Sequence, residues 1–442
     1  MDTQANHQNS FNLQCLNEQE SKIKQELYER LLDMLDVAKL EATEEKESRH
    51  QIARLCNQLL SERPKPISLS ARDKIIKQIN DEILGLGPLE PLLADNTVSD
   101  ILINSPKSIY VERFGKLEPV PFTFQDDRHL LNTIDKIVSN VGRRVDESSP
   151  LVDARLKDGS RVNAIIPPLA LDGPSMSIRR FTVDKLTAEQ LIEYQAMTQA
   201  MYEVLKACVV GKLNVLISGG TGSGKTTMLN VLSGYIPNDE RIITIEDSAE
   251  LQLQQPHVVR LESRPANLEG RGEITLRDLV KNSLRMRPDR IVVGEVRGGE
   301  ALDMLTAMNT GHEGSLTTLH ANSARDALSR LENMVCMSGF DMPVKNIRTQ
   351  VASAIDLIVQ LERQEDGRRR VVSIHEINGM EGEVITMSEL FVFRRKGRNE
   401  DGTIRGDFMA TGVIPGFYDE LVSKGINLSH SLFNTSEGFE IL

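Results

Sequence analysis

The sequence predicts an α/β fold in which a domain with a largely parallel sheet follows a smaller α+β domain and a helical N-terminal extension. Two observations lead to this prediction. Strand-like and helical segments alternate between residues 187 and 390, as they do where helices cover a parallel sheet. The first of those strands runs into a glycine-rich loop and then a helix, which is the local structure of a phosphate-binding loop. The chain of 442 residues is long enough for two or three domains of roughly 150 residues each.

The first 70 residues predict a polar start followed by a helical extension. Residues 1–20 are polar, and apolar residues then recur every three to four positions between residues 21 and 62, which predicts two amphipathic helices. Their apolar stripes can pack on the chain's own body or on a partner, and the sequence leaves both outcomes open. Arg63-Pro64-Lys65-Pro66 predicts a linker, because proline interrupts a helix.

Residues 71–186 predict an α+β domain with a small antiparallel sheet. The expected helices and strands are residues 74–84, 129–141, 101–103 and 108–112. The last part of the domain, residues 152–165, predicts a hairpin that turns at Asp158-Gly159. Arg155 and Arg161 lie on the two arms of this hairpin.

Residues 187–390 predict the α/β domain, and residues 391–442 are expected to form a C-terminal tail packed on it. The candidate strands are residues 215–218, 241–245, 291–294, 315–320 and 357–361. Ligands of such sheets bind beyond the carboxyl ends of the strands, and the glycine-rich loop follows the first strand at that end. The tail has turns rich in glycine and charge, and it predicts no chemistry.

The glycine-rich loop carries the most specific motif in the chain. Residues 219–226 match G-x-x-x-x-G-K-[ST] at every fixed position, with a strand before them and a helix after them. In such a loop backbone N–H groups face anionic oxygens, Lys225 reaches the β- and γ-phosphates, and the Thr226 hydroxyl can ligate Mg²⁺. A surface loop that is merely rich in glycine is the alternative. The expected nucleotide-binding residues are Gly219, Gly220, Thr221, Gly222, Ser223, Gly224, Lys225, Thr226 and Thr227.

Carboxylates follow two of the expected strands. Glu246 and Asp247 end the segment that begins at residue 242, and Glu295 ends the segment 290–294. A carboxylate at that place can hold a Mg²⁺-bound water or orient the attacking water. Structural strands also end in acidic residues, but two such ends behind a phosphate loop favour catalysis. We expect Thr226 and Glu295 to hold Mg²⁺ with its water, and Glu295 to orient the nucleophile, with Glu246 as the competing candidate.

Two histidines flank the expected strand 315–320. A lone histidine is more often a structural residue than a catalytic one, and zinc is not expected without further ligands at metal spacing. We expect His320 to contact the γ-phosphate, and His312 to be structural.

Composition excludes several other classes of protein. The formal net charge of -12 argues against a protein whose whole surface binds nucleic acid. An aromatic content of 4% also leaves few side chains on which the bases of a single strand could stack. The four cysteines show no C-x-x-C spacing, which excludes a cysteine-based zinc site and suits a reducing compartment. The N-terminus lacks a signal pattern, and no apolar run approaches 18 residues. We expect a cytoplasmic protein that reaches a membrane only through a partner.

These segments together resemble the type II/type IV secretion ATPase superfamily. The resemblance rests on the phosphate loop, on Ile243-Thr244-Ile245-Glu246-Asp247, on residues 285–301 around Glu295, and on Gly311-His312-Glu313-Gly314 with His320. In that family they correspond to the Walker A, Asp box, Walker B and His box. The resemblance implies a RecA-like P-loop ATPase domain that hydrolyses ATP with Mg²⁺ at the subunit boundaries of a cytoplasmic homo-hexamer.

Further segments resemble one branch, the tight-adherence (Tad/Cpa) pilus assembly ATPases. They are residues 85–90, 144–155 and 178–181, together with residues 389–391 and 410–412. The resemblance implies a motor for assembly or secretion of type IV-like (Flp/Tad) pili, which acts through an inner-membrane platform protein at the inner face of the bacterial inner membrane. The chain lacks the tetracysteine cluster of zinc-bearing type II exporters, which points to the Tad or Vir-like branches.

By the same resemblance, arginines of the α+β domain complete the nucleotide site. Arg155 and Arg161, and also Arg179 and Arg180, would lie beside the transferred phosphate. Paired arginines on a hairpin also suit an arginine finger, which accelerates phosphoryl transfer by about 10³ to 10⁵ where it operates. The alternative is that these are ordinary surface or salt-bridge arginines.

Two other functions remain as alternatives. A nucleic-acid translocase or helicase could use the same core, although the acidic charge and the few aromatic residues count against it, and no nucleic-acid partner is expected. A GTPase or small-molecule kinase is the second alternative. The chain has no Asn-Lys-x-Asp element to read guanine.

Overall fold

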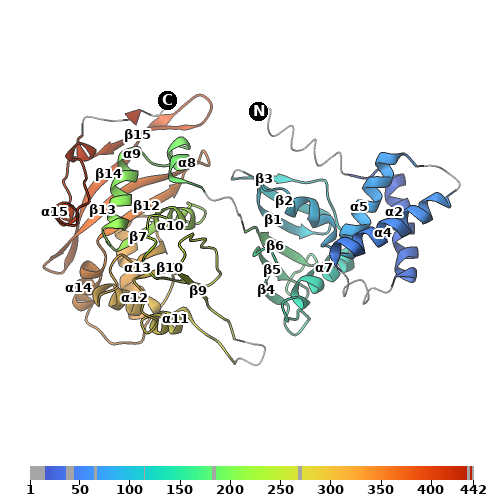
Figure 1. Cartoon of the computed structure of the whole chain (residues 1–442), viewed down its shortest axis with the longest axis horizontal. Coiled ribbons are helices and arrows are strands. Elements are labelled where there is room, and N and C mark those ends of the chain that lie inside the picture. Colours follow the sequence, from blue (N-terminus) through green and yellow to red (C-terminus); the bar gives the residue numbers. More distant parts are fainter. Residues whose placement is uncertain are drawn as a thin grey trace. The chain divides into compact units, whose positions relative to one another are not determined.

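The computed structural model describes residues 15–35, 44–63, 67–113, 115–181, 186–266, 271–435 and 439–440. The chain forms two compact units, residues 1–183 and 184–442 (Figure 1). The start of the polar segment, residues 1–14, and Pro64–Pro66 of the expected linker lie outside the described residues.

Within the described ranges, three helices form the N-terminal part of the first unit. They are α2 (Glu18–Met34), α4 (Glu45–Ser61) and α5 (Leu69–Ile83). A capping box starts α2, because the Asn17 side chain accepts a hydrogen bond from the Glu20 N–H and the Glu20 carboxylate accepts one from the Asn17 N–H. The apolar stripes of the three helices pack on one another, with Leu27, Ile52 and Ile75 fully buried. The stripes are therefore covered by the chain itself.

A six-stranded antiparallel sheet forms the rest of the first unit. Its strands are β1 (Val98–Ser105), β2 (Ser108–Arg113), β3 (Lys116–Pro119), β4 (Leu151–Arg155), β5 (Arg161–Ile165) and β6 (Ser175–Arg179), in the order β3-β2-β1-β6-β5-β4. The short helices η1 (Gly87–Leu89) and α6 (Glu90–Leu93) precede it, and α7 (Asp127–Ser139) packs against it. The β4–β5 hairpin turns at Asp158-Gly159 as predicted, with Gly159 at a φ of 93° that favours glycine.

A ten-stranded mixed sheet forms the centre of the second unit. Its strands are β7 (Val215–Gly219), β8 (Ile242–Glu246), β9 (Val258–Glu262), β10 (Arg290–Val296), β11 (Leu316–His320), β12 (Leu357–Arg363), β13 (Arg369–Glu381), β14 (Val384–Arg398), β15 (Ile404–Ala410) and β16 (Phe439–Glu440). The order is β16-β15-β14-β13-β12-β7-β11-β10-β8-β9. Strands β7 to β12 pair in parallel, whereas β13 to β16 add antiparallel strands at one edge.

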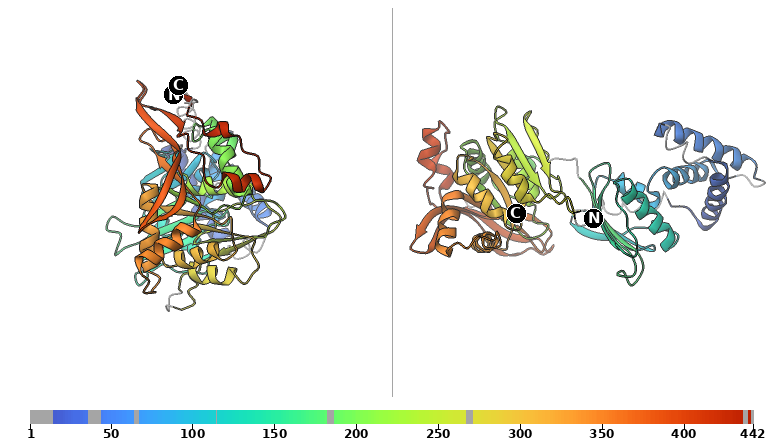
Figure 2. Two further views of the ribbon diagram at one scale, coloured as in Figure 1. Left: turned by 90° about the vertical axis from the view of Figure 1, so that its left-hand side faces the viewer. Right: turned by 90° about the horizontal axis from the view of Figure 1, so that it is seen from below.

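Helices cover both faces of this sheet (Figure 2). They are α8 (Ala188–Glu193), α9 (Gln199–Val210), α10 (Lys225–Ser233), α11 (Leu276–Ser283), α12 (Glu300–Asn309), α13 (Ala324–Cys336), α14 (Val344–Ala354), α15 (Tyr418–Ser423) and η2 (His430–Phe433). Successive residues of β7 enter opposite cores, because side chains alternate along a strand. Ile217 packs with α9 and α10, and Leu216 packs with α12 and α13.

The fold class predicted from the sequence is confirmed. An α/β unit follows an antiparallel β domain and a helical extension, and all five predicted strands of the central sheet are present. The sheet is less uniformly parallel than expected, because residues 369–410 form long antiparallel strands on it. Across the described ranges, no helix combines the length and the apolar character that crossing a membrane requires.

Candidate nucleotide site

The glycine-rich loop joins the end of β7 to the start of α10. Gly222 and Gly224 have φ angles of 70° and 95°, in the left-handed region that side chains with a Cβ rarely adopt. Gly219 is needed for space, since a Cβ there would lie 2.4 Å from Ser223 Oγ and 2.7 Å from Leu361 O. The backbone therefore bends tightly before α10, and the N-terminus of that helix adds positive potential where phosphate oxygens would bind.

Lys225 is the first residue of α10, and its side chain turns back over the loop. Its Nζ donates hydrogen bonds to Gly219 O at 3.0 Å and to Gly220 O at 2.9 Å. Burial lowers the pKa of Lys225, and the negative charge of Glu295 opposes that change. The structure thus brings the lysine and the expected Walker B carboxylate together, although the two residues belong to different strand–helix connections.

Glu295 lies near the end of β10 and is bound by an arginine that follows it. Arg297 donates to Glu295 Oε2 from Nη2 at 2.6 Å and from Nε at 3.0 Å. The same guanidinium donates from Nη1 to Asp247 Oδ2 at 3.2 Å, so it joins the ends of β10 and β8. Partial burial opposes ionisation of Arg297, but the hydrogen bond with Glu295 and its charge raise the pKa of this guanidinium. The arginine fixes the direction of the Glu295 carboxylate.

Glu246 ends β8 and is buried beside β10. Its Oε2 accepts hydrogen bonds from the backbone N–H groups of Glu250 at 2.7 Å and Leu251 at 2.9 Å, whereas its buried Oε1 has no partner. Burial raises the pKa of the Glu246 carboxyl to about 7, and the two N–H groups act in the opposite direction. A Cβ on Gly294 would lie 2.9 Å from Glu246 Cγ, so this carboxylate packs closely on the neighbouring strand. Glu246 can therefore exchange a proton near neutral pH.

The two predicted histidines lie at opposite ends of β11. His320 ends the strand and pairs in register with Gly219, which places it next to the glycine-rich loop. Burial and the charge of Lys225 lower the pKa of His320, which favours the neutral imidazole. His312 precedes the strand, where its backbone N–H donates to Ala307 O at 3.3 Å.

The predicted arginines belong to the first unit. Arg155 lies opposite Arg161 on β4 and β5, and Arg161 lies opposite Arg179 on β6, so three cations form a row across the sheet. Arg179 also pairs with Asp100 at 3.3 Å. Arg180 is directed elsewhere, because its Nη1 donates to Asp95 O. The structure brings Arg155, Arg161 and Arg179 together and separates Arg180 from them.

The donor atoms at the loop suit Mg²⁺ bound with a nucleotide. Within the described ranges, no three His, Cys, Asp or Glu side chains gather into a site that could hold a metal ion alone. Mg²⁺ usually takes one or two carboxylates together with phosphate oxygens and water. Thr226 in the first turn of α10 and Glu295 near the end of β10 are hard oxygen donors of that kind. The residues present therefore fit a nucleotide-bound Mg²⁺.

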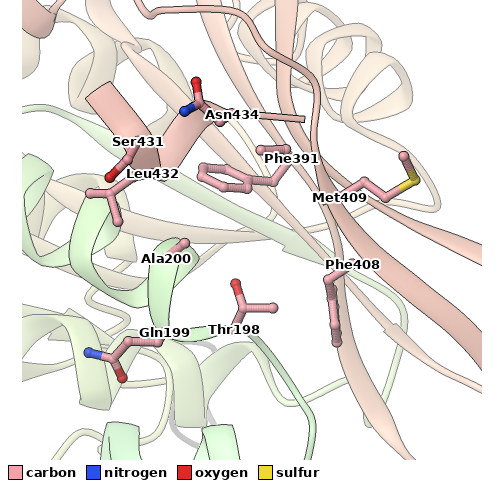
Figure 3. Close-up of a pocket in the computed structure, with 10 residues that line it drawn as sticks. Thr198, Gln199, Ala200, Phe391, Phe408, Met409, Ser431, Leu432 and Asn434 are labelled. Atoms are coloured by element: carbon pink, nitrogen blue, oxygen red, sulfur yellow. The ribbon is translucent and has the colours of Figure 1, made fainter. Parts of the chain in front are cut away.

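A separate cavity of about 160 Å³ lies between the start of α9, strands β14 and β15, and the η2 segment (Figure 3). Thr198, Ala200, Phe391 and Phe408 line part of it. None of the residues expected to bind nucleotide belongs to its lining. The cavity and the glycine-rich loop are thus distinct features.

Sequence reasoning missed three arginines at this site. Arg297 lies in the segment that suggested the Walker B motif, yet only the fold shows that it joins Glu295 to Asp247. Arg363 and Arg369 lie on either side of the turn at Gly367, and Arg369 contacts the glycine-rich loop. The sequence contained one indication of these residues, because several arginines cluster around the turn at Gly367.

Comparisons with known proteins place the chain in a family. Residues 82–400 match the family described as type II/IV secretion system protein. A Mycobacterium tuberculosis protein named for conjugal transfer is 37% identical over 315 residues, which cover 70% of this chain and 89% of that protein. Conjugal transfer protein TrbB of Rhizobium radiobacter is 32% identical and covers 70% of this chain and 92% of its own. Type IV secretion system protein VirB11 of Bartonella quintana is 31% identical, with coverages of 66% and 91%.

Two solved structures are also similar. The VirB11 ATPase of the Brucella suis type IV secretion system, crystallised with sulphate, is 27% identical with a TM-score of 0.36, and the match covers 66% of this chain and 96% of that one. The Legionella pneumophila ATPase DotB is 22% identical with a TM-score of 0.47, and the match covers 66% and 80%. From the family match and the relatives that match over most of their own length, the chain belongs to the type II/IV secretion system ATPase family, a family of ATP hydrolases.

Proposed function

We propose that this chain is the hexameric motor that powers assembly of Flp/Tad-type pili, and that ATP with Mg²⁺ is bound at residues 219–227. The observation that supports the nucleotide site most strongly is the meeting of Lys225, Glu295 and His320 at the carboxyl ends of adjacent parallel strands. A cation that neutralises phosphate charge and a carboxylate that positions water are groups that phosphoryl transfer to water uses, and an imidazole beside them can contact the γ-phosphate.

Each group has a distinct role in hydrolysis. Lys225 neutralises charge on the β- and γ-phosphates, and His320 contacts the γ-phosphate. Glu295, oriented by Arg297, positions the attacking water, and Glu246 is the competing base because its pKa of about 7 allows proton exchange. Thr226 and Glu295 would hold Mg²⁺, which when bound would neutralise charge that develops on the phosphates.

The hexamer places arginines of one subunit at the site of its neighbour. Arg155, Arg161 and Arg179 form a row of cations on the first unit, and a row of this kind attracts an anionic transition state. Arg180 contributes less directly, since its guanidinium contacts Asp95 O. Size measurement by light scattering with a nonhydrolysable ATP analogue tests the assembly: a six-fold particle supports the ring, and a monomer at every nucleotide concentration contradicts it.

The motor works in the cytoplasm and is peripheral to the inner face of the bacterial inner membrane, where it binds a platform protein of the pilus machine. Resemblance of residues 85–90, 144–155 and 178–181 to Tad ATPases supports this branch. Deletion of the gene tests it: loss of surface pili, restored by the wild-type chain and not by Lys225→Ala, is the expected result. Pili that persist without the gene contradict the proposal.

A conjugation-type secretion motor is the second candidate, because several relatives are named for conjugal transfer. The same deletion strain separates the two functions, since loss of DNA transfer with normal pili would favour conjugation. A nucleic-acid translocase would show ATP hydrolysis that DNA stimulates. We expect none, because the formal net charge of the chain is -12.

A further inference from the structure

The hairpin of β12 and β13 places two arginines against the glycine-rich loop. Arg369 Nε donates a hydrogen bond to Gly222 O at 2.9 Å. Arg369 Cδ also lies 3.5 Å from the position that a Cβ on Gly224 would occupy, and Arg363 Nη1 lies 3.3 Å from the corresponding position on Gly222. Both glycines that have left-handed backbone in this loop are therefore contacted by the hairpin.

Hydrogen bonds and an ion pair hold the tip of the hairpin in place, so it can support the glycine-rich loop. Arg363 and Arg369 lie directly opposite each other, and the turn between them is closed by a 2.8 Å hydrogen bond from Gln364 N to Arg368 O. Arg370 is fully buried and contacts Asp366, whose Oδ2 accepts a 2.9 Å hydrogen bond from Ile404 N. These contacts hold the hairpin tip against the rest of the sheet. They therefore also limit the movement of Arg369.

The charges around the tip favour an anion nearby. Side chains directly opposite each other on antiparallel strands share a face, and two like charges in that arrangement repel. Within the turn, Glu365 pairs with Arg395, and Asp366 pairs with Arg370. A polyphosphate in the adjacent loop would place further negative charge beside Arg363 and Arg369.

The bond to Gly222 O also determines where the next N–H points. In a trans peptide the C=O and the following N–H point in opposite directions. Arg369 holds the carbonyl side of the Gly222–Ser223 peptide, and Ser223 N–H, on its other side, donates to Gly220 O at 3.4 Å within the loop. The orientation of such peptides decides which backbone N–H groups can bind phosphate oxygens in loops of this type.

We propose that Arg369 is a positioning residue that holds the phosphate loop in its anion-binding shape, with Arg363 beside it as a second cation from the same subunit. This inference rests on the proposed binding of nucleotide at residues 219–227. Arg369 acts on the loop backbone and not on the γ-phosphate. It should therefore assist binding of ADP and ATP equally and leave the rate of the bound complex unchanged.

The chain offers a matched control for the test. Arg368 precedes Arg369 on the same hairpin, but its Nη1 donates to Gln195 Oε1 and not to the loop. Full-length wild type, Arg369→Ala, Arg369→Lys and Arg368→Ala are compared by titration with fluorescent ADP and a fluorescent nonhydrolysable ATP analogue. We expect Arg369→Ala to weaken both affinities about tenfold, as loss of one charge-assisted hydrogen bond does. KM should rise with kcat unchanged, Arg369→Lys should recover only part of the loss, and Arg368→Ala should bind like wild type.

Hydrogen exchange of the free protein supplies a second readout that does not depend on nucleotide. We expect the amides of residues 220–226 to exchange faster in Arg369→Ala, and not in Arg368→Ala. Wild-type affinity and wild-type exchange in Arg369→Ala would overturn the inference while leaving the proposed function intact. Absence of nucleotide binding in the wild type would instead overturn the proposed function, and the exchange comparison would still decide whether Arg369 holds the loop.

Discussion

Arg297 binds the carboxylate of Glu295 through two hydrogen bonds, from Nη2 at 2.6 Å and Nε at 3.0 Å, only two residues further along the chain. Its third contact, with Asp247 at 3.2 Å, ties this pair to the end of β8. A carboxylate that orients water must be held within a narrow range of directions, and a guanidinium fork does this better than a single donor. Arg297 therefore holds the carboxylate of Glu295 in one orientation.

Removal of Arg297 should slow hydrolysis without weakening nucleotide binding. We expect Arg297→Ala to lower kcat for ATP at least about tenfold, because it removes both charge-assisted hydrogen bonds to Glu295, with KM nearly unchanged. Steady-state phosphate release measures both values. Arg264→Ala is the control, because Arg264 is exposed in the same unit and donates to Gly272 O. An unchanged kcat in Arg297→Ala would show that Glu295 does not depend on this contact.

Removal of Lys225 should abolish hydrolysis and leave the fold intact. Its Nζ donates to two loop carbonyls, so Lys225→Ala deletes a charge at the phosphates. We expect phosphate release at background level and a circular dichroism melting curve close to that of the wild type. A variant that hydrolyses ATP at the wild-type rate would refute the assignment.

Glu246 should make the stability of the protein depend on pH. Its carboxyl has a pKa of about 7 in the folded chain against 4.5 as the ordinary value, so the folded state holds the proton more tightly. The resulting stabilisation is complete below about pH 4.5 and is lost as the pH rises through about 7, by an amount on the order of 3 kcal/mol. We expect the melting temperature to fall between pH 5 and pH 8 more steeply in the wild type than in Glu246→Gln. If the melting temperatures of the two proteins changed equally with pH, Glu246 would not be the source of the pH dependence.

Sites shared between subunits should allow two inactive chains to rescue each other. When Arg155→Ala and Lys225→Ala subunits are mixed, some boundaries combine an intact loop with intact arginines, so ATP hydrolysis should partly recover. A mixture of Arg144→Ala and Lys225→Ala subunits serves as the control, since Arg144 pairs with Asp146 on the surface. No recovery above the two separate proteins would indicate a site built within one chain.

The parallel strands and the loop could be predicted because local sequence determines them. All residues of β7 and β8 are buried, and such continuous apolar runs are visible without a structure. Strands β13 and β14 were missed because their buried residues follow no regular alternation and the strands carry many charges, including the fully buried Arg370. From the sequence alone, segments with this composition are predicted to form turns and not strands.

The support around the site could not be predicted, because it joins residues far apart in the chain. Arg369 and Gly222 are separated by 147 positions, and Arg297 and Asp247 by 50. No local pattern specifies these contacts, which arise only when β12 pairs with β7 and β10 pairs with β8. The motif residues were found from their types, and the arginines that hold them were found from the fold.

Isothermal titration of the purified full-length chain with a nonhydrolysable ATP analogue and Mg²⁺ tests the central claim most directly. We expect saturable binding at one site per chain, with Lys225→Ala showing no measurable heat under the same conditions. Absence of binding by the folded wild type, or equal binding by Lys225→Ala, would contradict the claim that residues 219–227 hold the nucleotide.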